Sequence, residues 1–179
     1  MRICVYGAAS DKVDNLYKEI VEQLGETIAT KQHQLIFGGG ATGMMGAVSR
    51  GAFRQNGRVV GVVPSFMSTF EPISEDNPNL NVIHVETMAE RKAVMEQNSD
   101  MFIITPGGIG TWDEFFQILT LKELGRVNPN CQILVLNINN YYTKLLEVLT
   151  DGMDAGFVRP TLRSMYEVCT SLEELEAYL

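Results

Sequence analysis

The residues best suited to chemistry lie in one glycine-rich segment, residues 106–114, which reads PGGIGTWDE. Its three glycines have no Cβ, so the chain can adopt positive φ angles there and a ligand can approach the backbone amides. A helix that begins near Thr111 would add unpaired N–H groups and the positive end of its dipole, which together favour an anion such as phosphate. The segment therefore predicts a phosphate site that is followed closely by the carboxylate of Glu114.

Glu114 also has a simpler interpretation. Thr111 and Glu114 have the spacing of a capping box, in which the glutamate would bond only to the first amide of its own helix. A carboxylate one turn into a helix that faces a pocket is equally well placed to contact a ligand. The two roles can coexist.

Arg91 is the residue most able to partner this carboxylate. It shares a helical stripe with Met88 and Met95, so its guanidinium would need a carboxylate or a phosphate to offset its desolvation. The alternative is an arginine at the edge of the core whose charged end reaches water. Lys92 could add a second positive charge or lie on the surface.

A second glycine turn, residues 38–46, contains a GxGxxG pattern at Gly38, Gly40 and Gly43. Taken alone this pattern suggests a dinucleotide, but no acid follows at the end of the next expected strand to hold a ribose 2'-hydroxyl. The lysine of a P-loop is also absent, and the turn could serve only close packing. Two glycine turns on neighbouring strands nevertheless favour a mononucleotide-sized ligand between two helix N-termini.

The elements that must position these residues alternate along the chain. Short apolar runs predict strands at 3–6, 35–37, 59–63, 82–85, 101–105 and 133–136, and helical periodicity predicts helices at 14–30, 42–55, 87–98, 111–124, 141–149 and 171–179. This order is typical of an α/β fold with a single Rossmann-like, doubly wound parallel sheet and helices on both faces. Ligands of such sheets bind beyond the C-terminal ends of the strands, where both glycine turns fall.

Size and composition limit the function classes. A chain of 179 residues that is 45% apolar can bury one core, so residues 1–179 are expected to form a single nucleotide-binding domain. No apolar segment approaches the ~18 residues that span a bilayer, which predicts a cytoplasmic protein without a membrane partner. The net charge of −8 argues against nucleic acid as a partner. No cluster of metal-binding side chains is evident, and we expect neither a metal nor a cofactor.

Three motifs together are similar to those of the LOG family of nucleoside 5'-monophosphate phosphoribohydrolases. They are FGGGATGMMG at 37–46, ERK at 90–92 and PGGIGTWDE at 106–114. The resemblance runs from the first expected strand to about residue 157. It implies hydrolysis of the N-glycosidic bond of cytokinin riboside 5'-monophosphates, of AMP, or of both, with release of the free base and ribose 5-phosphate. Many relatives carry the label lysine decarboxylase, but that reaction normally needs a pyridoxal phosphate Schiff base in a larger fold.

The resemblance also assigns roles to individual residues. Arg91 and Glu114 are the implied catalytic pair, and Glu114 would orient or deprotonate the attacking water and stabilise a ribosyl cation. The expected substrate contacts are Ser10, Gly39, Gly40, Glu71, Met88, Lys92, Gly107, Gly108, Ile109, Gly110, Thr111 and Thr120. The family often has Gly-Ser-Ser where this chain has Ala8-Ala9-Ser10, and it usually has glutamate in place of Asp113.

Two other functions stay open on the sequence alone. A non-catalytic nucleotide sensor or carrier could use the same turns without turnover, and a nicotinamide oxidoreductase is a more distant alternative. Whether the base carries a prenyl group is also undecided. The expected helix 111–124 is apolar on more than one side, which exceeds the need of one core and predicts a homodimer. The expected ligand, from the glycine turns and the resemblance, is a small-molecule nucleoside monophosphate.

Overall fold

A parallel sheet of seven strands forms the centre of the computed structural model, which describes residues 1–69 and 77–179. Its strands are β1 (Arg2–Tyr6), β2 (Gln34–Phe37), β3 (Arg58–Pro64), β4 (Leu80–Val85), β5 (Met101–Ile104), β6 (Gln132–Leu136) and β7 (Glu167–Cys169). Their order across the sheet is β4-β3-β2-β1-β5-β6-β7, and every neighbouring pair is parallel. The chain winds outward from β1 to β4 and then returns to β5, which places a topological switch point between β1 and β5.

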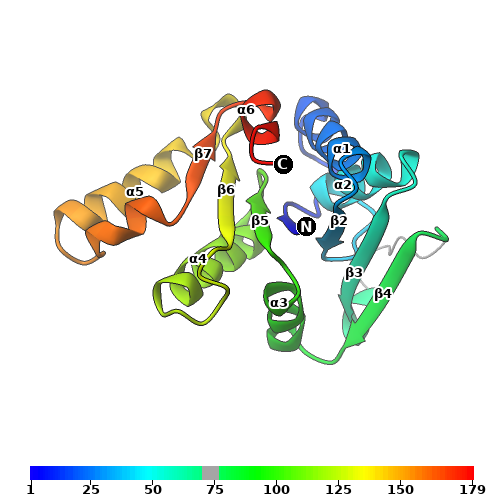
Figure 1. The fold of residues 1–179 in the computed structure, drawn as a ribbon, viewed down its shortest axis with the longest axis horizontal. Coiled ribbons are helices and arrows are strands. Elements are labelled where there is room, and N and C mark those ends of the chain that lie inside the picture. Colours follow the sequence, from blue (N-terminus) through cyan, green and yellow to red (C-terminus); the bar gives the residue numbers. More distant parts are fainter. Residues whose placement is uncertain (70–76) are drawn as a thin grey trace.

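Helices cover both faces of this sheet. They are α1 (Asn15–Thr30), α2 (Gly43–Arg54), α3 (Met88–Gln97), α4 (Ile109–Glu123), α5 (Thr143–Asp154) and α6 (Leu172–Glu176). Figure 1 shows α1, α2 and α6 on one side of the sheet and α3 and α4 on the other. The predicted α/β class, the doubly wound parallel sheet and all six expected strands are therefore confirmed.

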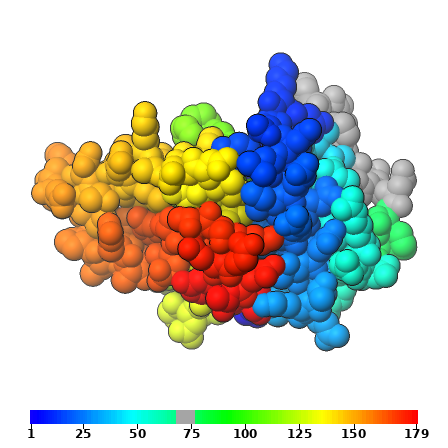
Figure 2. All heavy atoms as spheres, turned by 90° about the horizontal axis from the view of Figure 1, so that it is seen from above, coloured from blue at the N-terminus to red at the C-terminus, as the bar shows by residue number. Residues whose placement is uncertain are grey.

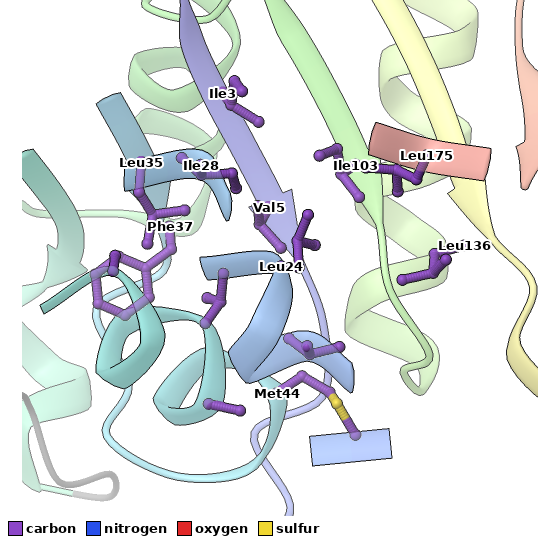
Figure 3. Packing of buried hydrophobic residues seen from close by; sticks show 14 of the residues in the cluster. Ile3, Val5, Leu24, Ile28, Leu35, Phe37, Met44, Ile103, Leu136 and Leu175 are labelled. Atoms are coloured by element: carbon purple, nitrogen blue, oxygen red, sulfur yellow. The ribbon is translucent and has the colours of Figure 1, made fainter. Parts of the chain in front are cut away.

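The two cores follow from alternation along the central strand. Ile3 and Val5 of β1 face α1 and α2, whereas Cys4 and Tyr6 face α3 and α4, and all four side chains are buried. Figure 3 shows how the first of these sets meets the apolar stripe of α1. Complete burial of one such aliphatic side chain contributes about 1.5–3 kcal/mol, so both faces hold β1 firmly in place.

The last helix completes the core on the α1 side. Leu175 of α6 is fully buried, and Thr27 of α1 donates a hydrogen bond of 2.7 Å to the Glu176 carboxylate. Lys31 donates a second bond, 2.9 Å long, to the Glu176 carbonyl. Figure 2 shows this C-terminal segment in red against the blue N-terminal part of the chain.

The apolar surface of α4 is mostly covered by the chain itself. Phe115, Ile118 and Leu119 are buried in the core, so the surplus of apolar residues expected from the sequence is smaller than predicted. Large apolar side chains that remain exposed include Ile109 at the start of α4, at 75%, and Phe157 and Val148 outside this helix, at 91% and 62%. In the described ranges, no helix is both long and apolar enough to cross a bilayer.

Candidate active site

A cavity of about 350 Å³ opens at the switch point between β1 and β5. Its walls are the loop after β1, the start of α3 and the start of α4. The residues that line it are Val5, Tyr6, Gly7, Ala8, Ala9, Ser10, Gly38, Met45, Met67, Met88, Arg91, Gly108, Gly110, Thr111, Asp113 and Glu114. Its volume lies in the range of small-molecule sites, and both residues of the expected catalytic pair line it.

Arg91 and Glu114 meet at the buried side of this cavity. Nη1 of Arg91 lies 3.5 Å from Oε1 of Glu114, and the two residues are only 6% and 7% exposed. Two further bonds fix the guanidinium, because Nε donates to the Val62 carbonyl at 3.2 Å and Nη2 donates to the Gly38 carbonyl at 3.3 Å. The alternative in which the charged end of Arg91 reaches water is therefore wrong.

Gly38 provides the space that the guanidinium occupies. A Cβ at this position would collide with Nη2 of Arg91. The first glycine of the GxGxxG pattern thus allows a close approach between backbone and side chain, while its carbonyl orients the same arginine. The glycine turn at residues 38–46 therefore helps to position Arg91 of the ion pair, and its predicted contact with a ligand phosphate is not needed for this role.

Burial changes the acid–base behaviour of Glu114. Loss of hydration raises the pKa of its carboxyl from 4.5 to about 7, and the positive charge of Arg91 offsets only part of that increase. The negative charge of neighbouring Asp113 adds to the increase. A carboxyl with a pKa near neutrality can exchange a proton with a reacting group at physiological pH.

A second ion pair lies at the edge of the cavity. Nζ of Lys92 lies 2.8 Å from Oδ2 of Asp113, and the lysine side chain is 15% exposed whereas the aspartate side chain is 58% exposed. Met88, which begins α3 one helical turn before Lys92, lines the cavity with 39% of its surface exposed. Lys92 therefore brings a positive charge near the site, but Asp113 partly neutralises it.

The start of α4 differs from the prediction in a way that matters for Glu114. The helix begins at Ile109 with Gly108 as its N-cap, so Thr111 is its third residue and the expected capping box of Thr111 and Glu114 is wrong. The Thr111 side chain instead covers Gly107, where a Cβ would collide with it. Because the cap does not use Glu114, its carboxylate is available to Arg91 and to the cavity.

The N-terminus of α4 is open to a ligand. Within the described parts of the chain, the amides of Ile109, Gly110 and Thr111 have no acceptor. A Cβ at Gly108 or Gly110 would meet no atom within 4 Å, so the space above the turn is free. Unpaired amides at a helix start attract an anion, as the sequence predicts for this segment.

The N-terminus of α2 is closed, in contrast to the second expected phosphate site. The Asp11 carboxylate accepts a hydrogen bond of 2.9 Å from the Gly43 amide, and the Ala8 carbonyl accepts one of 2.7 Å from Met44. Gly39 and Gly40 are buried and do not line the cavity. Only one of the two predicted helix starts thus offers its amides to a ligand.

The remaining expected contacts occupy different places. Ser10 is exposed at the cavity edge, Gly107 is buried beneath the turn, and Ile109 is 75% exposed outside the cavity lining. Thr120 lies in a separate hollow of about 260 Å³ with Phe157, so this chain alone does not bring it to the cavity. The expected contact at position 71 lies outside the described residues.

Sequence reasoning missed several residues that shape the site. Met67, in the short 3-10 turn η1 (Ser65–Thr69), lines the cavity, and no pattern in the sequence singles it out. A full capping box begins α3, in which Thr87 accepts from the Glu90 amide and Glu90 accepts from the Thr87 amide. The TxxE spacing of this box was a readable signal for the start of the helix that carries Arg91.

Comparison with known proteins identifies relatives of high similarity. Residues 45–179 match a family model described as possible lysine decarboxylase. The chain is 39% identical to the cytokinin riboside 5'-monophosphate phosphoribohydrolase of Rhodococcoides fascians over 158 residues, which cover 88% of this chain and 78% of that protein. It is 34% identical to the cytokinin riboside 5'-monophosphate phosphoribohydrolase LOG1 of Arabidopsis thaliana, with 97% of this chain and 80% of that protein covered.

Solved structures of lower identity share the fold. The molybdenum cofactor binding protein of Rippkaea orientalis superposes with a TM-score of 0.72 at 21% identity. The superposition covers 99% of this chain and 93% of the Rippkaea orientalis chain. The molybdenum cofactor carrier protein of Chlamydomonas reinhardtii gives a TM-score of 0.70 at 20% identity, and the superposition covers 99% of this chain and 94% of the carrier protein chain. These likenesses confirm the architecture of the sheet and its helices.

Proposed function

Because this chain belongs to the LOG family of cytokinin riboside 5'-monophosphate phosphoribohydrolases, we propose that it hydrolyses the N-glycosidic bond of nucleoside 5'-monophosphates. The products are the free base and ribose 5-phosphate. The observation that carries this proposal is the buried ion pair of Arg91 and Glu114 in a cavity that also holds an open helix start. Such a cavity can place an acid–base group against a sugar and amides against its phosphate.

The reaction needs a negative charge close to the sugar. Cleavage of a ribosyl C–N bond passes through an oxocarbenium-like state, in which positive charge grows on the ribose and the bonding electron pair moves to the base. The ionised carboxylate of Glu114 stabilises that positive charge, and it accepts a proton from the water whose oxygen bonds to C1'. The raised pKa of Glu114 suits this role, because a base with a pKa of about 7 is both ionisable and effective near neutral pH.

Arg91 positions the Glu114 carboxylate and favours its ionised form. Its bonds to the Val62 and Gly38 carbonyls hold the guanidinium at the ends of β3 and β2, so Nη1 faces Glu114 from a fixed direction. Without this cation the burial of Glu114 would raise its pKa further, and less of it would be ionised at neutral pH. We therefore assign Arg91 to orientation of Glu114 and of the substrate.

The phosphate of the substrate is assigned to the start of α4. The open amides of Gly110 and Thr111 and the positive end of the helix dipole supply a local attraction that the overall charge of −8 does not. Lys92 lies nearby and can exchange its contact with Asp113 for one with the phosphate. The glycines leave room for the phosphate oxygens to reach the backbone.

The base is assigned to the apolar part of the cavity. Met45, Met67 and Met88 come from three separate segments and line the same space. Methionine side chains adapt to irregular apolar groups, and their sulfur atoms contact aromatic rings favourably. This lining suits a purine, with or without an apolar N6 substituent.

One assay tests the proposed reaction directly. The protein is incubated with AMP and separately with isopentenyladenosine 5'-monophosphate, and both free base and ribose 5-phosphate are measured. Equimolar release of the two products is expected for at least one substrate. Tight binding of both nucleotides without release would favour a non-catalytic binding module and would refute the proposed function.

We also propose that the described residues act as one domain and that this domain forms a homodimer. Phe157 is 91% exposed and borders the hollow that contains Phe116, Leu119 and Thr120, which makes this apolar region suitable for contact with a second copy. Light scattering should give about twice the mass of one chain. Replacing Phe157 with serine should lower that mass, and a monomer in the unmodified protein would refute the assembly.

A further inference from the structure

Tyr141 makes a hydrogen bond to the glycine turn that the proposed reaction does not yet explain. Its hydroxyl donates to the Gly107 carbonyl at 2.7 Å, from a segment that follows β6. We propose that Tyr141 is a positioning residue, which fixes the peptide between Gly107 and Gly108 so that the Gly108 amide faces the cavity. This inference rests on the proposed function, since it assigns a role within the phosphate site.

The proposed role of Tyr141 depends on the geometry of the peptide between Gly107 and Gly108. The Gly107 carbonyl and the Gly108 N–H belong to the same planar peptide, and no cis peptide bond occurs in the described ranges, so the two groups point in opposite directions. Gly107 is buried and Gly108 is exposed in the cavity wall. A hydroxyl that holds the carbonyl on the protein side therefore turns the amide toward the ligand.

The glycines make such an external constraint necessary. Residues on both sides of this peptide lack a Cβ. The Thr111 side chain packs against Gly107, but a Cβ at Gly108 would meet no atom within 4 Å, so steric contacts do not hold the Gly108 side of the peptide plane. The hydrogen bond from Tyr141 supplies a constraint on the carbonyl of this peptide. A site in which a flexible turn is held in its binding orientation before the ligand arrives loses less entropy on binding.

Tyr141 is itself held in place by its neighbours. Its ring meets the Tyr17 ring edge-on, with centroids 6.3 Å apart and an angle of 70°, and it meets the Tyr142 ring at 5.0 Å and 83°. The turn that leads to it, η2 (Ile138–Asn140), contains Asn139 and Asn140 with φ angles of 51° and 59°. The Tyr141 hydroxyl is thus presented from a defined turn.

Tyr142 supplies a matched control. Its hydroxyl donates to the Thr105 carbonyl, also at 2.7 Å, from a fully buried side chain. That carbonyl belongs to the peptide of Pro106, which has no N–H, so this bond anchors the end of β5 without presenting a donor to the cavity. The two tyrosines therefore form bonds of equal length to carbonyls two residues apart. The Tyr142 hydroxyl also interacts with the backbone of Gly107, but only the bond from Tyr141 is made to the carbonyl of the peptide that carries the Gly108 amide.

The test compares three variants, Tyr141→Phe, Tyr142→Phe and Tyr17→Phe, by isothermal titration with ribose 5-phosphate and with adenosine. Loss of one hydrogen bond that orients a charge-binding amide is expected to weaken ribose 5-phosphate binding about tenfold in Tyr141→Phe. Adenosine, which has no phosphate, should bind this variant as it binds the unmodified protein. Tyr17→Phe should bind both ligands normally, and Tyr142→Phe should lower the melting temperature and keep the ratio of the two affinities.

Three results would overturn the inference. They are an unchanged affinity of Tyr141→Phe for ribose 5-phosphate, an equal loss for adenosine, or the same selective loss in Tyr142→Phe. Because these titrations need no turnover, they remain decisive if the protein releases no base from any nucleotide. If hydrolysis does occur, Tyr141→Phe should raise KM for AMP about tenfold and leave kcat nearly unchanged, since chemistry at Glu114 is not altered.

Discussion

Replacing Glu114 with glutamine should make the protein more stable at alkaline pH, although the same change should suppress hydrolysis. Burial holds the pKa of this carboxyl at about 7, against 4.5 for an ordinary glutamate. Between these two pH values the folded protein keeps a proton that the unfolded chain has lost. The stability provided by this proton is complete below about pH 4.5 and is lost as the pH rises through about 7.

The size of the effect follows from the two pKa values. Their difference, about 7 minus 4.5, corresponds to about 3 kcal/mol of unfolding free energy once the carboxyl is ionised in both states. Between about pH 5.5 and about pH 8.5, the linkage relation assigns ~2 kcal/mol of this loss to the unmodified protein. Glutamine has no proton to lose, so Glu114→Gln should gain ~2 kcal/mol relative to the unmodified protein over that interval.

The assay is urea unfolding of both proteins at the two pH values. Constant effects of the substitution, such as the contact between the new amide and Arg91, cancel when the difference between the proteins is compared across pH. Glu147→Gln on the exposed side of α5 serves as the control and should show no such gain. A stability difference between Glu114→Gln and the unmodified protein that is the same at both pH values would refute the account of this carboxyl.

Three further substitutions test how the site is built. Arg91→Lys keeps the positive charge but loses the two guanidinium bonds to the Val62 and Gly38 carbonyls, so kcat/KM should fall at least tenfold. An unchanged kcat/KM would show that these two bonds are not needed for activity. Gly38→Ala should displace the guanidinium and lower both activity and stability, the latter by ~1–3 kcal/mol in urea unfolding; full activity would contradict the close contact. Thr87→Ala removes the N-cap of α3 and should cost ~1 kcal/mol of stability at unchanged kcat, whereas unaltered stability would indicate that the cap contributes nothing.

The sheet was predictable because most of its strands are short runs of apolar residues. The run from Met101 to Ile104 is apolar at every position, as a strand covered on both faces must be, and all four side chains are buried. The strand β7 was missed because it has three residues, two of them exposed, and thus no apolar run. Helix α5 continues five residues beyond its expected end, through Asp151 and Gly152, which are residue types of low helix propensity and so gave no signal for this extension.

The site was predictable in its residue types and less so in its geometry. Arg91 and Glu114 could be paired because a buried guanidinium needs an anion, and the structure brings them together. The closure of the α2 start was not readable, because the groups that occupy it, Asp11 and Ala8, come from a loop some thirty residues earlier. The pKa of Glu114 likewise depends on burial by several elements, which local spacing does not describe.

The rate at which the protein releases free base from a nucleoside 5'-monophosphate, compared with the rate of its Glu114→Gln variant at about pH 8, tests the central claim most directly. The unmodified protein should release base and ribose 5-phosphate in equal amounts. The variant should be folded and should bind the nucleotide, but its turnover should be lower by about a hundredfold or more, as expected when a positioned acid–base group is removed. Equal turnover by the two proteins would contradict the assignment of the chemistry to Glu114.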